Sequence, residues 1–251
     1  MDRILIIPAA GRGSRLGSDL PKALVPVAGR PMIEHLLDRH HPFVDRAVVV
    51  VAPSAVDRFE AFAATRRHDI DLVVQENPTG MLDAITVATP VVAALQPRRV
   101  AITWCDQVAV ASGTARRLWS HALARTPAMV FPTLEVERPY IHFDRDPSGR
   151  IVGVRQRREG DRMPDRGETD MGLFDLSFAA YTRMLPAFAA QATVAANTGE
   201  RNFLPFIPWL AAQAEVDTIR GESVIETVGI NTPEELAAVE AHLRLGNGPP
   251  P

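Results

Sequence analysis

The chain has 251 residues, of which 46% are hydrophobic, a formal net charge of −3 at pH 7 and a single cysteine. This composition is ample for a sizeable core, and the slightly negative balance gives no reason to expect nucleic acid or an anionic membrane as a partner. One cysteine excludes an internal disulfide, and no apolar run approaches the ~20 residues of a membrane span, so we expect a cytoplasmic protein without a leader segment.

A continuous apolar run, Arg3–Ile7, opens the chain and predicts a strand that is buried on both faces. The segment from Pro8 to Ser14 is rich in glycine and other small residues, which lets backbone N–H groups surround an anion such as phosphate. The residues expected to cradle the phosphate are Ala9, Ala10, Gly11, Arg12, Gly13 and Ser14. Arg15 then offers a fork of donors and Lys22 a compact charge, the two kinds of cation that bind phosphate.

Lys22 is the only lysine among 27 basic residues. A planar guanidinium does not replace an ammonium, so a chain that uses arginine almost everywhere needs the lysine here. The alternative is a flexible turn beside a solvated basic stretch. The segment does not fit the dinucleotide fingerprint, which would need glycine at Leu16, or the P-loop, which ends Gly-Lys-Ser/Thr directly before a helix.

Extended apolar runs and helical patterns alternate through the first half of the chain. Strands are expected at 47–51, 72–74 and 100–104, and helices at 31–37, 56–63, 82–88 and 112–122. Pro90 should interrupt the pattern that starts at Leu82, and Ser112 should cap the helix that it begins. This alternation predicts an α/β protein with a Rossmann-like three-layer α/β/α arrangement and a mostly parallel mixed sheet.

The second half of the chain changes character. Tyr140–Asp144 and Ile151–Arg155, with a turn at 146–149 between them, predict a hairpin. The charged stretch Gln156–Asp170 predicts a mobile loop. Further strands are expected at 172–176, 216–219 and 224–228, and further helical stretches at 177–188 and 203–213. Thr232 should start the last helix with a capping box.

Asp106 directly follows the strand expected at 100–104. In an open α/β sheet, ligands bind beyond the carboxyl ends of the strands, so this carboxylate should face the same crevice as the glycine-rich segment. A single aspartate can anchor Mg²⁺, because the ion is bound through one or two carboxylates together with substrate phosphates and water. The alternative is an ordinary loop aspartate or a helix cap.

The opening of the chain resembles a known family. Gly-Arg-Gly-Ser-Arg at 11–15 and Pro-Lys-Ala-Leu-Val-Pro-Val-Ala-Gly-Arg-Pro-Met-Ile-Glu-His from Pro21 onward are similar to the first motif of the sugar-phosphate nucleotidylyltransferases and MobA-like NTP transferases. The resemblance is specific over residues 4–37 and weaker to about residue 243. It implies a nucleotide-diphospho-sugar transferase (GT-A-like) fold in a single domain at 1–245, with a nucleotide-binding half at about 1–135, an acceptor-binding half at about 136–245 and a flexible tail at 246–251.

The resemblance also implies roles for later residues. The family places an Asp or Asn at Asn231, one residue before Thr-Pro-Glu, as a second metal ligand beside Asp106; the alternative is support of the helix start. The stretch from Gln75 to Gly80 resembles Gln-x-x-Pro-x-Gly of thymidylyl- and uridylyltransferases, where the glutamine and a glycine backbone read a pyrimidine edge. We therefore expect UTP or dTTP to be favoured and CTP to come next.

The implied reaction needs no nucleophile or general base from the protein. A phosphate on the acceptor attacks the α-phosphorus of a nucleoside triphosphate in line, and pyrophosphate leaves. Arg15 and the loop N–H groups would bind the β- and γ-phosphates, and Lys22 the α-phosphate. Mg²⁺ on Asp106 and Asn231 is the expected cofactor, which makes Arg15, Lys22 and Asp106 the candidate catalytic residues.

The acceptor region departs from the family pattern. Tyr140-Ile141 and Arg155-Gln156 stand where relatives that use sugar phosphates often have Tyr-Gly and Val-Glu, which puts an ordinary hexose 1-phosphate in doubt. The candidate acceptor-binding residues are Tyr140, Glu159, Glu168 and Asp170. The stretch 156–170 is either a lid that closes over the acceptor or a solvated connector.

Two other function classes stay open. A glycosyltransferase of the same general fold would hold its metal with Asp-x-Asp, whereas this chain has Asp106-Gln107-Val108. A non-catalytic nucleotide sensor could keep the loop and lose the metal, although intact Lys22, Asp106 and Asn231 argue against that. The expected partners are a nucleoside triphosphate and a phosphorylated small molecule, with a homo-oligomer left open and neither nucleic acid nor membrane.

Overall fold

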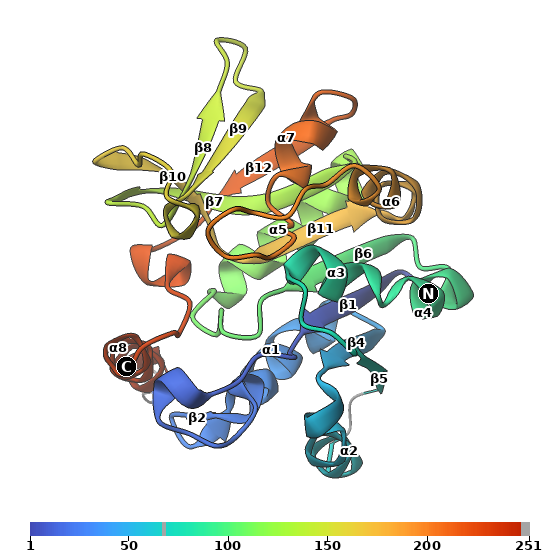
Figure 1. Ribbon diagram of the computed structural model, residues 1–251, viewed down its shortest axis with the longest axis vertical. Helices are drawn as coiled ribbons and strands as arrows, with labels where there is room; N and C mark the ends of the chain where they lie inside the picture. Colours follow the sequence, from blue (N-terminus) through green and yellow to red (C-terminus); the bar gives the residue numbers. More distant parts are fainter. Residues whose placement is uncertain (67–68, 247–251) are drawn as a thin grey trace.

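An eight-stranded mixed sheet forms the centre of the computed structural model, which describes residues 1–66 and 69–246 (Figure 1). The strand order is β10-β7-β11-β6-β1-β4-β5, and β12 pairs with β7. The strands are β1 (Arg3–Pro8), β4 (Arg46–Val51), β5 (Ile70–Val74), β6 (Arg99–Thr103), β7 (Met129–Glu137), β10 (Arg166–Asp170), β11 (Leu173–Ser177) and β12 (Val216–Arg220). Within this sheet β1, β4, β5 and β6 run parallel, whereas β10 and β11 are antiparallel to their neighbours.

Helices cover both faces of the sheet. On one face lie α1 (Met32–His40), α2 (Val56–Ala64), α5 (Ser112–Arg125) and α8 (Pro233–Gly246). On the other lie α3 (Met81–Thr86), α4 (Thr89–Leu95), α6 (Leu185–Ala189) and α7 (Phe206–Ala211). The predicted three-layer α/β/α class with a mostly parallel mixed sheet is confirmed. None of the described helices is both long and apolar enough to cross a membrane.

The sequence of β1 explains why it lies at the centre. Leu5 and Ile7 pack into the core on one face, and Ile4 and Ile6 pack into the core on the other, all with no exposed surface. Successive side chains of a strand point to opposite faces, so a strand without polar alternation needs helices on both sides. The parallel pairs β1–β4, β4–β5 and β1–β6 then bring the carboxyl ends of four strands to one edge of the sheet.

Two small antiparallel pairs stand beside the main sheet. β2 (Pro26–Val27) pairs with β3 (Arg30–Pro31), and β8 (Ile141–Arg145) pairs with β9 (Ile151–Gln156). The predicted hairpin is thus confirmed, and it extends away from the sheet at the top of Figure 1. Its turn is held by Asp146, which accepts hydrogen bonds from the N–H groups of Ser148 and Arg150 at 2.9 and 3.1 Å.

Two local expectations are wrong, and one buried carboxylate, Glu226, explains both. Ser112 does not cap α5, because the preceding Ala111 is the capping residue and its N–H donates to Glu226 at 2.9 Å. Residues 224–228 do not form a strand, since Val224–Thr227 is a short 3-10 helix that starts with a capping box between Ser223 and Glu226. A carboxylate that satisfies several N–H groups at once favours a helix start over an extended strand.

The mobile loop expected at 156–170 is also wrong over part of its length. Gln156 completes β9, Arg157–Glu159 form a short 3-10 helix, and Arg166–Asp170 form the strand β10 on the edge of the main sheet. The charges do not keep the segment in solvent because they are paired; Glu168, for example, binds Arg145. Of the flexible tail expected at 246–251, residues 247–251 lie outside the described residues, and Gly246 ends α8.

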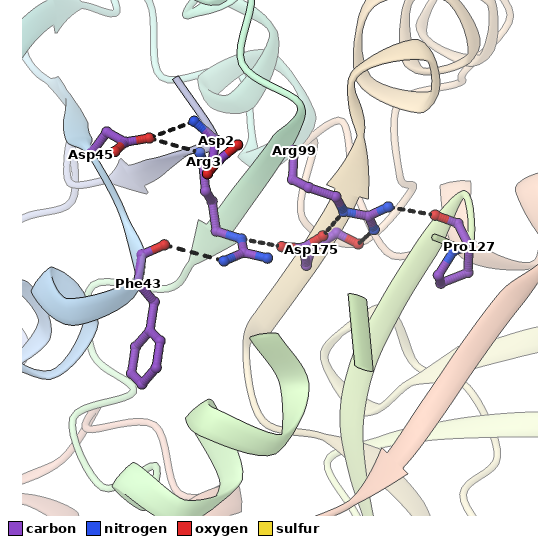
Figure 2. A network of polar contacts seen from close by, with 7 residues as sticks. All are labelled: Asp2, Arg3, Phe43, Asp45, Arg99, Pro127 and Asp175. Carbon is purple, nitrogen blue, oxygen red and sulfur yellow. Dashed lines mark hydrogen bonds and ion pairs between the residues drawn. The ribbon is translucent and has the colours of Figure 1, made fainter. Parts of the chain in front are cut away.

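A buried ion triad links the central strands β1, β6 and β11 (Figure 2). It lies near the amino-terminal ends of β1 and β6. Asp175 of β11 accepts a hydrogen bond of 2.6 Å from Nε of Arg3 on β1 and another from Nε of Arg99 on β6. Arg3 also donates to the Phe43 carbonyl, and Arg99 to the Pro127 carbonyl. The three charged residues are no more than 4% exposed, so each depends on these partners for solvation.

We expect Asp175→Ala to lower the free energy of unfolding by about 3–5 kcal/mol, because it leaves two buried guanidinium groups without their carboxylate. Chemical denaturation followed by circular dichroism measures this. The matched control is Asp71→Ala, which breaks the half-exposed Arg46–Asp71 pair and should cost about 1 kcal/mol or less. Equal losses in the two variants would contradict the role of the triad.

Candidate active site

Three polar side chains from distant parts of the chain meet beyond the carboxyl end of β6. Lys22 begins the short 3-10 helix Lys22–Leu24, Asp106 lies in the turn after β6, and Asn231 lies just before α8. The Lys22 ammonium donates one hydrogen bond to Asp106 Oδ2 and another, of 2.8 Å, to Asn231 Oδ1. The structure therefore brings together three residues that sequence patterns singled out separately.

Backbone hydrogen bonds hold the segments that carry these side chains. The Lys22 N–H donates to the Gly11 carbonyl at 3.0 Å, which ties the lysine to the glycine-rich segment after β1. The Ile230 N–H donates to the Asp106 carbonyl at 3.2 Å, which places the start of α8 against the turn after β6. The ammonium and its two oxygen partners thus sit on backbone that is fixed on each side.

Asn231 is oriented by its neighbours. Its Nδ2 donates to the Gly229 carbonyl at 3.1 Å, which leaves Oδ1 to face Lys22. Its N–H donates to Glu235 at 2.7 Å, and Glu235 also completes the predicted capping box with Thr232. Sequence reasoning did not assign Glu235 to the site, although the Thr-x-x-Glu spacing that predicts the cap also predicts where this carboxylate points.

Asp106 and Asn231 fit a magnesium ion. A carboxylate and an amide oxygen are hard donors, and here both already converge on one positive charge, the Lys22 ammonium. Gly229 keeps the space beside them open, since a Cβ there would lie 3.3 Å from Asp106 Oδ1. Among the described residues no cluster of three or more His, Cys, Asp or Glu side chains could hold a metal, so substrate phosphates and water would complete the coordination.

The glycine-rich segment forms a compact arch between β1 and Lys22. The Gly13 N–H donates to the Leu20 carbonyl at 3.1 Å, and a Cβ on Gly13 would lie 2.6 Å from that oxygen, so the close approach requires glycine. Arg12 and Arg15 are exposed, and their guanidinium groups have no side-chain or carbonyl partner within the described part of the chain. The arch therefore presents uncommitted positive charge beside Lys22. It also contains Ala9, Ala10, Gly11 and Ser14.

Gln75 and Gly80 lie together at the end of β5. The Gln75 N–H donates to the Val51 carbonyl at 2.9 Å, so the residue sits at the same sheet edge as the arch. Its buried side chain points Nε2 toward the Gly80 carbonyl at 3.4 Å, which leaves Oε1 as an acceptor. Gly80 has a φ of 128°, a conformation that favours glycine, and it is the N-cap residue of α3.

Asp170 is the acceptor candidate that lies on the Asp106 side of the crevice. It ends β10, is 6% exposed, and accepts a hydrogen bond of 2.8 Å from the Gly172 N–H. Burial raises the pKa of Asp170 to about 6, and the negative charge of Asp106 acts in the same direction. A buried carboxyl whose pKa is raised beside a second carboxylate is a common feature of functional sites.

The other acceptor candidates have different surroundings. Tyr140 is 56% exposed. Glu168 is bound by both ends of the Arg145 guanidinium at 2.7 Å, so its carboxylate is already engaged. Arg145 holds the pKa of Glu168 below its usual value even though burial acts to raise it. Glu168 thus serves to anchor the β8–β9 hairpin to β10.

Glu159 keeps one oxygen without a partner. Its Oε1 accepts hydrogen bonds from Thr198 and Asn202, each of 2.8 Å, whereas Oε2 is buried and has no hydrogen-bond partner among the described residues. Burial acts to raise the pKa of Glu159, but the hydrogen bonds from Asn202 and Thr198 hold it below its usual value. Arg158, 3.7 Å from Oε1, also acts to lower the pKa, and Oε2 is left as a buried acceptor without a hydrogen bond.

Comparisons with known proteins identify the family of the chain. Residues 5–216 match the family model described as the MobA-like NTP transferase domain. The bifunctional protein GlmU of Burkholderia orbicola (strain MC0-3) is 28% identical over 241 residues, and that of Burkholderia thailandensis is 27% identical over 239 residues. Each alignment covers 94% of this chain and 51% of the relative, so the chain spans about half the length of these curated proteins.

A solved structure shares the fold. HddC from Yersinia pseudotuberculosis, whose crystal structure is described as a complex with GMP-PN, superposes with a TM-score of 0.66. The superposition covers 97% of this chain and 100% of that chain, at 17% sequence identity. The likeness at this identity is one of fold, and the predicted fold class agrees with it.

We expect Asp170→Asn to change how stability depends on pH. Because the folded-state pKa of Asp170, about 6, lies above its ordinary value of 3.8, the folded protein holds the proton more tightly, and this stabilisation is complete below pH ~4 and lost as the pH rises through ~6. The variant has no charge to bury. Its free energy of unfolding relative to wild type should therefore rise by on the order of 2–3 kcal/mol between pH 4 and pH 7, as measured by urea denaturation. A difference that does not vary with pH would refute this assignment.

Proposed function

The chain belongs to the MobA-like NTP transferase domain family and is a nucleotidyltransferase, and on that premise we propose that it transfers a nucleoside monophosphate from a nucleoside triphosphate to a phosphorylated small molecule, a sugar phosphate, and releases pyrophosphate. The observation that carries this proposal is the position of the Lys22 ammonium between the oxygens of Asp106 and Asn231, next to the glycine-rich arch. A cation and two hard oxygen donors at the carboxyl edge of a parallel sheet suit a triphosphate.

Positioning and charge neutralisation supply the catalysis in this proposal. The arch N–H groups and the uncommitted guanidinium of Arg15 bind the β- and γ-phosphates. Lys22 moves its hydrogen bonds from Asp106 and Asn231 to the α-phosphate and neutralises the charge that develops there in the transition state. Asp106 and Asn231 would hold Mg²⁺, which when bound supplies Lewis-acid stabilisation of the phosphate oxygens. The acceptor phosphate is already ionised, so no general base is needed.

The acceptor would bind on the side of Asp170 and Glu159. Asp170 lies close enough to Asp106 for their charges to interact, and Glu159 has an unpartnered carboxylate oxygen that suits a hydroxyl donor. Tyr140 remains a candidate at the exposed start of the β8–β9 hairpin. Glu168 is the weakest of the four because Arg145 occupies its carboxylate.

The base would be read by Gln75 and Gly80. The free Oε1 of Gln75 is an acceptor, and N3–H of uracil or thymine is the donor that it fits; cytosine lacks that hydrogen at its N3. A site built to pair with one base edge rejects another because its own polar groups go unpaired. We therefore propose that UTP or dTTP is preferred and that CTP comes next.

We expect Lys22→Ala to lower turnover by on the order of 10²–10³, the range for the loss of one transition-state donor, and Lys22→Arg should not restore it. Steady-state pyrophosphate release measures the effect. Asn231→Asp is the matched control, since it keeps an oxygen at the position that faces Lys22, and its turnover should stay near that of wild type. Normal turnover of Lys22→Arg would show that a compact ammonium is not required.

The function itself is tested by pyrophosphate release from each of four nucleoside triphosphates with a panel of sugar phosphates. We expect release with at least one pair, highest with UTP or dTTP, that stops in EDTA and in Asp106→Ala. Tight nucleotide binding without release from any pair would favour the non-catalytic sensor. A clear preference for GTP would disprove the proposed reading by Gln75.

A further inference from the structure

A strap of nine residues, 195–203, contacts both the turn that contains Gly80 and the side chain of Glu159. It lies in the segment between α6 and α7, which crosses in front of β11 in Figure 1. A turn shapes it, since the Ala195 N–H donates to the Glu200 carbonyl and the Gly199 N–H to the Ala195 carbonyl, both at 2.9 Å. Gly199 has a φ of 68°, which suits glycine. The strap is therefore a folded element with a defined course.

Arg201 pairs its backbone with the turn that contains Gly80. The Arg201 N–H donates to the Thr79 carbonyl at 2.8 Å, and the Leu82 N–H donates to the Arg201 carbonyl at 3.0 Å. These bonds flank Gly80 on both sides. A Cβ on Gly80 would lie 2.5 Å from both the N and the O atom of Arg201, so the two backbones are in direct contact. The position of Gly80 thus depends on the strap.

The Arg201 side chain locks this contact in place. Nη1 donates to Asp83 Oδ1 on α3, and Nη2 donates to the Ala189 carbonyl at the end of α6. The two acceptors lie on different helices, so one guanidinium joins α3, α6 and the strap. Lysine could keep one of these bonds but not both in the same geometry.

Residues on either side of Arg201 in the strap hold Glu159. Thr198 and Asn202 donate the two hydrogen bonds that Glu159 Oε1 accepts, and Glu200 pairs with Arg158 at 2.9 Å. One short element therefore contacts the turn proposed to read the base and the carboxylate proposed to bind the acceptor. A shift of Arg201 would therefore displace both the turn at Gly80 and the carboxylate of Glu159.

We propose that Arg201 is a positioning residue that sets base selectivity by holding Gly80, and through it Gln75, against the nucleobase. The inference rests on the proposed function and adds to it the residue that fixes the turn that reads the base. Gln75 Nε2 bonds to the Gly80 carbonyl, so a displaced Gly80 also releases the Gln75 amide. In this proposal Arg201 does not contact the nucleobase; it acts through Gly80 and Gln75.

The test is calorimetric binding of UTP, dTTP, CTP, ATP, GTP and inorganic tripolyphosphate to wild type and Arg201→Ala, without acceptor. Loss of the guanidinium bonds to Asp83 and the Ala189 carbonyl, which lock the backbone pairing around Gly80, should reduce the ratio between the tightest and weakest nucleotide by about tenfold. This corresponds to ~1.4 kcal/mol, the scale of one hydrogen bond. Tripolyphosphate contacts only the arch and Lys22, so its affinity should not change. Asp83→Asn should move the ratio in the same direction, and Arg201→Lys should restore part of it.

The control is Arg46→Ala, which removes a guanidinium from the half-exposed pair with Asp71 between β4 and β5, away from the strap. An unchanged nucleotide ratio in Arg201→Ala would overturn the inference, and so would an equal loss of nucleotide and tripolyphosphate affinity, which indicates general loosening. Tight binding of all five nucleotides by wild type with equal affinity would also overturn the inference. If wild type discriminates between bases but releases no pyrophosphate, the proposed function fails while the role of Arg201 in base recognition stands.

Discussion

The contact of the Lys22 ammonium with Asp106 and Asn231 is the interaction on which the crevice depends. It joins positions 84 and 209 residues apart in the chain, and it brings the glycine-rich arch, the turn after β6 and the start of α8 to one point. The side chains of Lys22 and Asp106 are 11% and 15% exposed, so each charge needs the other unless a phosphate or a metal replaces it. The charges that hold these three segments together are therefore the ones that a triphosphate would use under the proposed function.

The buried ion triad and the candidate active site lie at opposite ends of the parallel strands β1 and β6. Arg3, Arg99 and Asp175 occupy the edge where β1 and β6 begin, where their buried charges satisfy one another and backbone carbonyls. Lys22 and Asp106 lie beyond the carboxyl ends of β1 and β6, Lys22 at the start of a short 3-10 helix and Asp106 in a turn. Parallel strands produce this division, because all their carboxyl ends open onto the same side.

Charge pairs surround the β8–β9 hairpin and β10. Arg145 binds Glu168, Arg155 binds Asp144, and Arg158 binds Glu200. These pairs order a stretch that looks solvated in the sequence. Asp170 differs from these paired carboxylates, because it is buried and its printed partner is the Gly172 N–H, whereas Glu159 has Arg158 3.7 Å from one oxygen and no hydrogen bond on the other.

Patterns of a few neighbouring residues predicted the alternating strands and helices, the glycine-rich segment and the capping box at Thr232, and they made Lys22 and Asp106 candidate site residues. The resemblance to the family added Asn231. The local patterns misplaced the cap at Ser112 and the element at 224–228, since both depend on Glu226, and they missed β10 because the partners of that strand are residues of β7 and the β8–β9 hairpin. Only the tertiary structure decided that Lys22 faces both oxygens and that Arg201 contacts Gly80. The physical reason is that such contacts join residues more than 80 positions apart, and no local pattern of side chains records where a distant segment will lie.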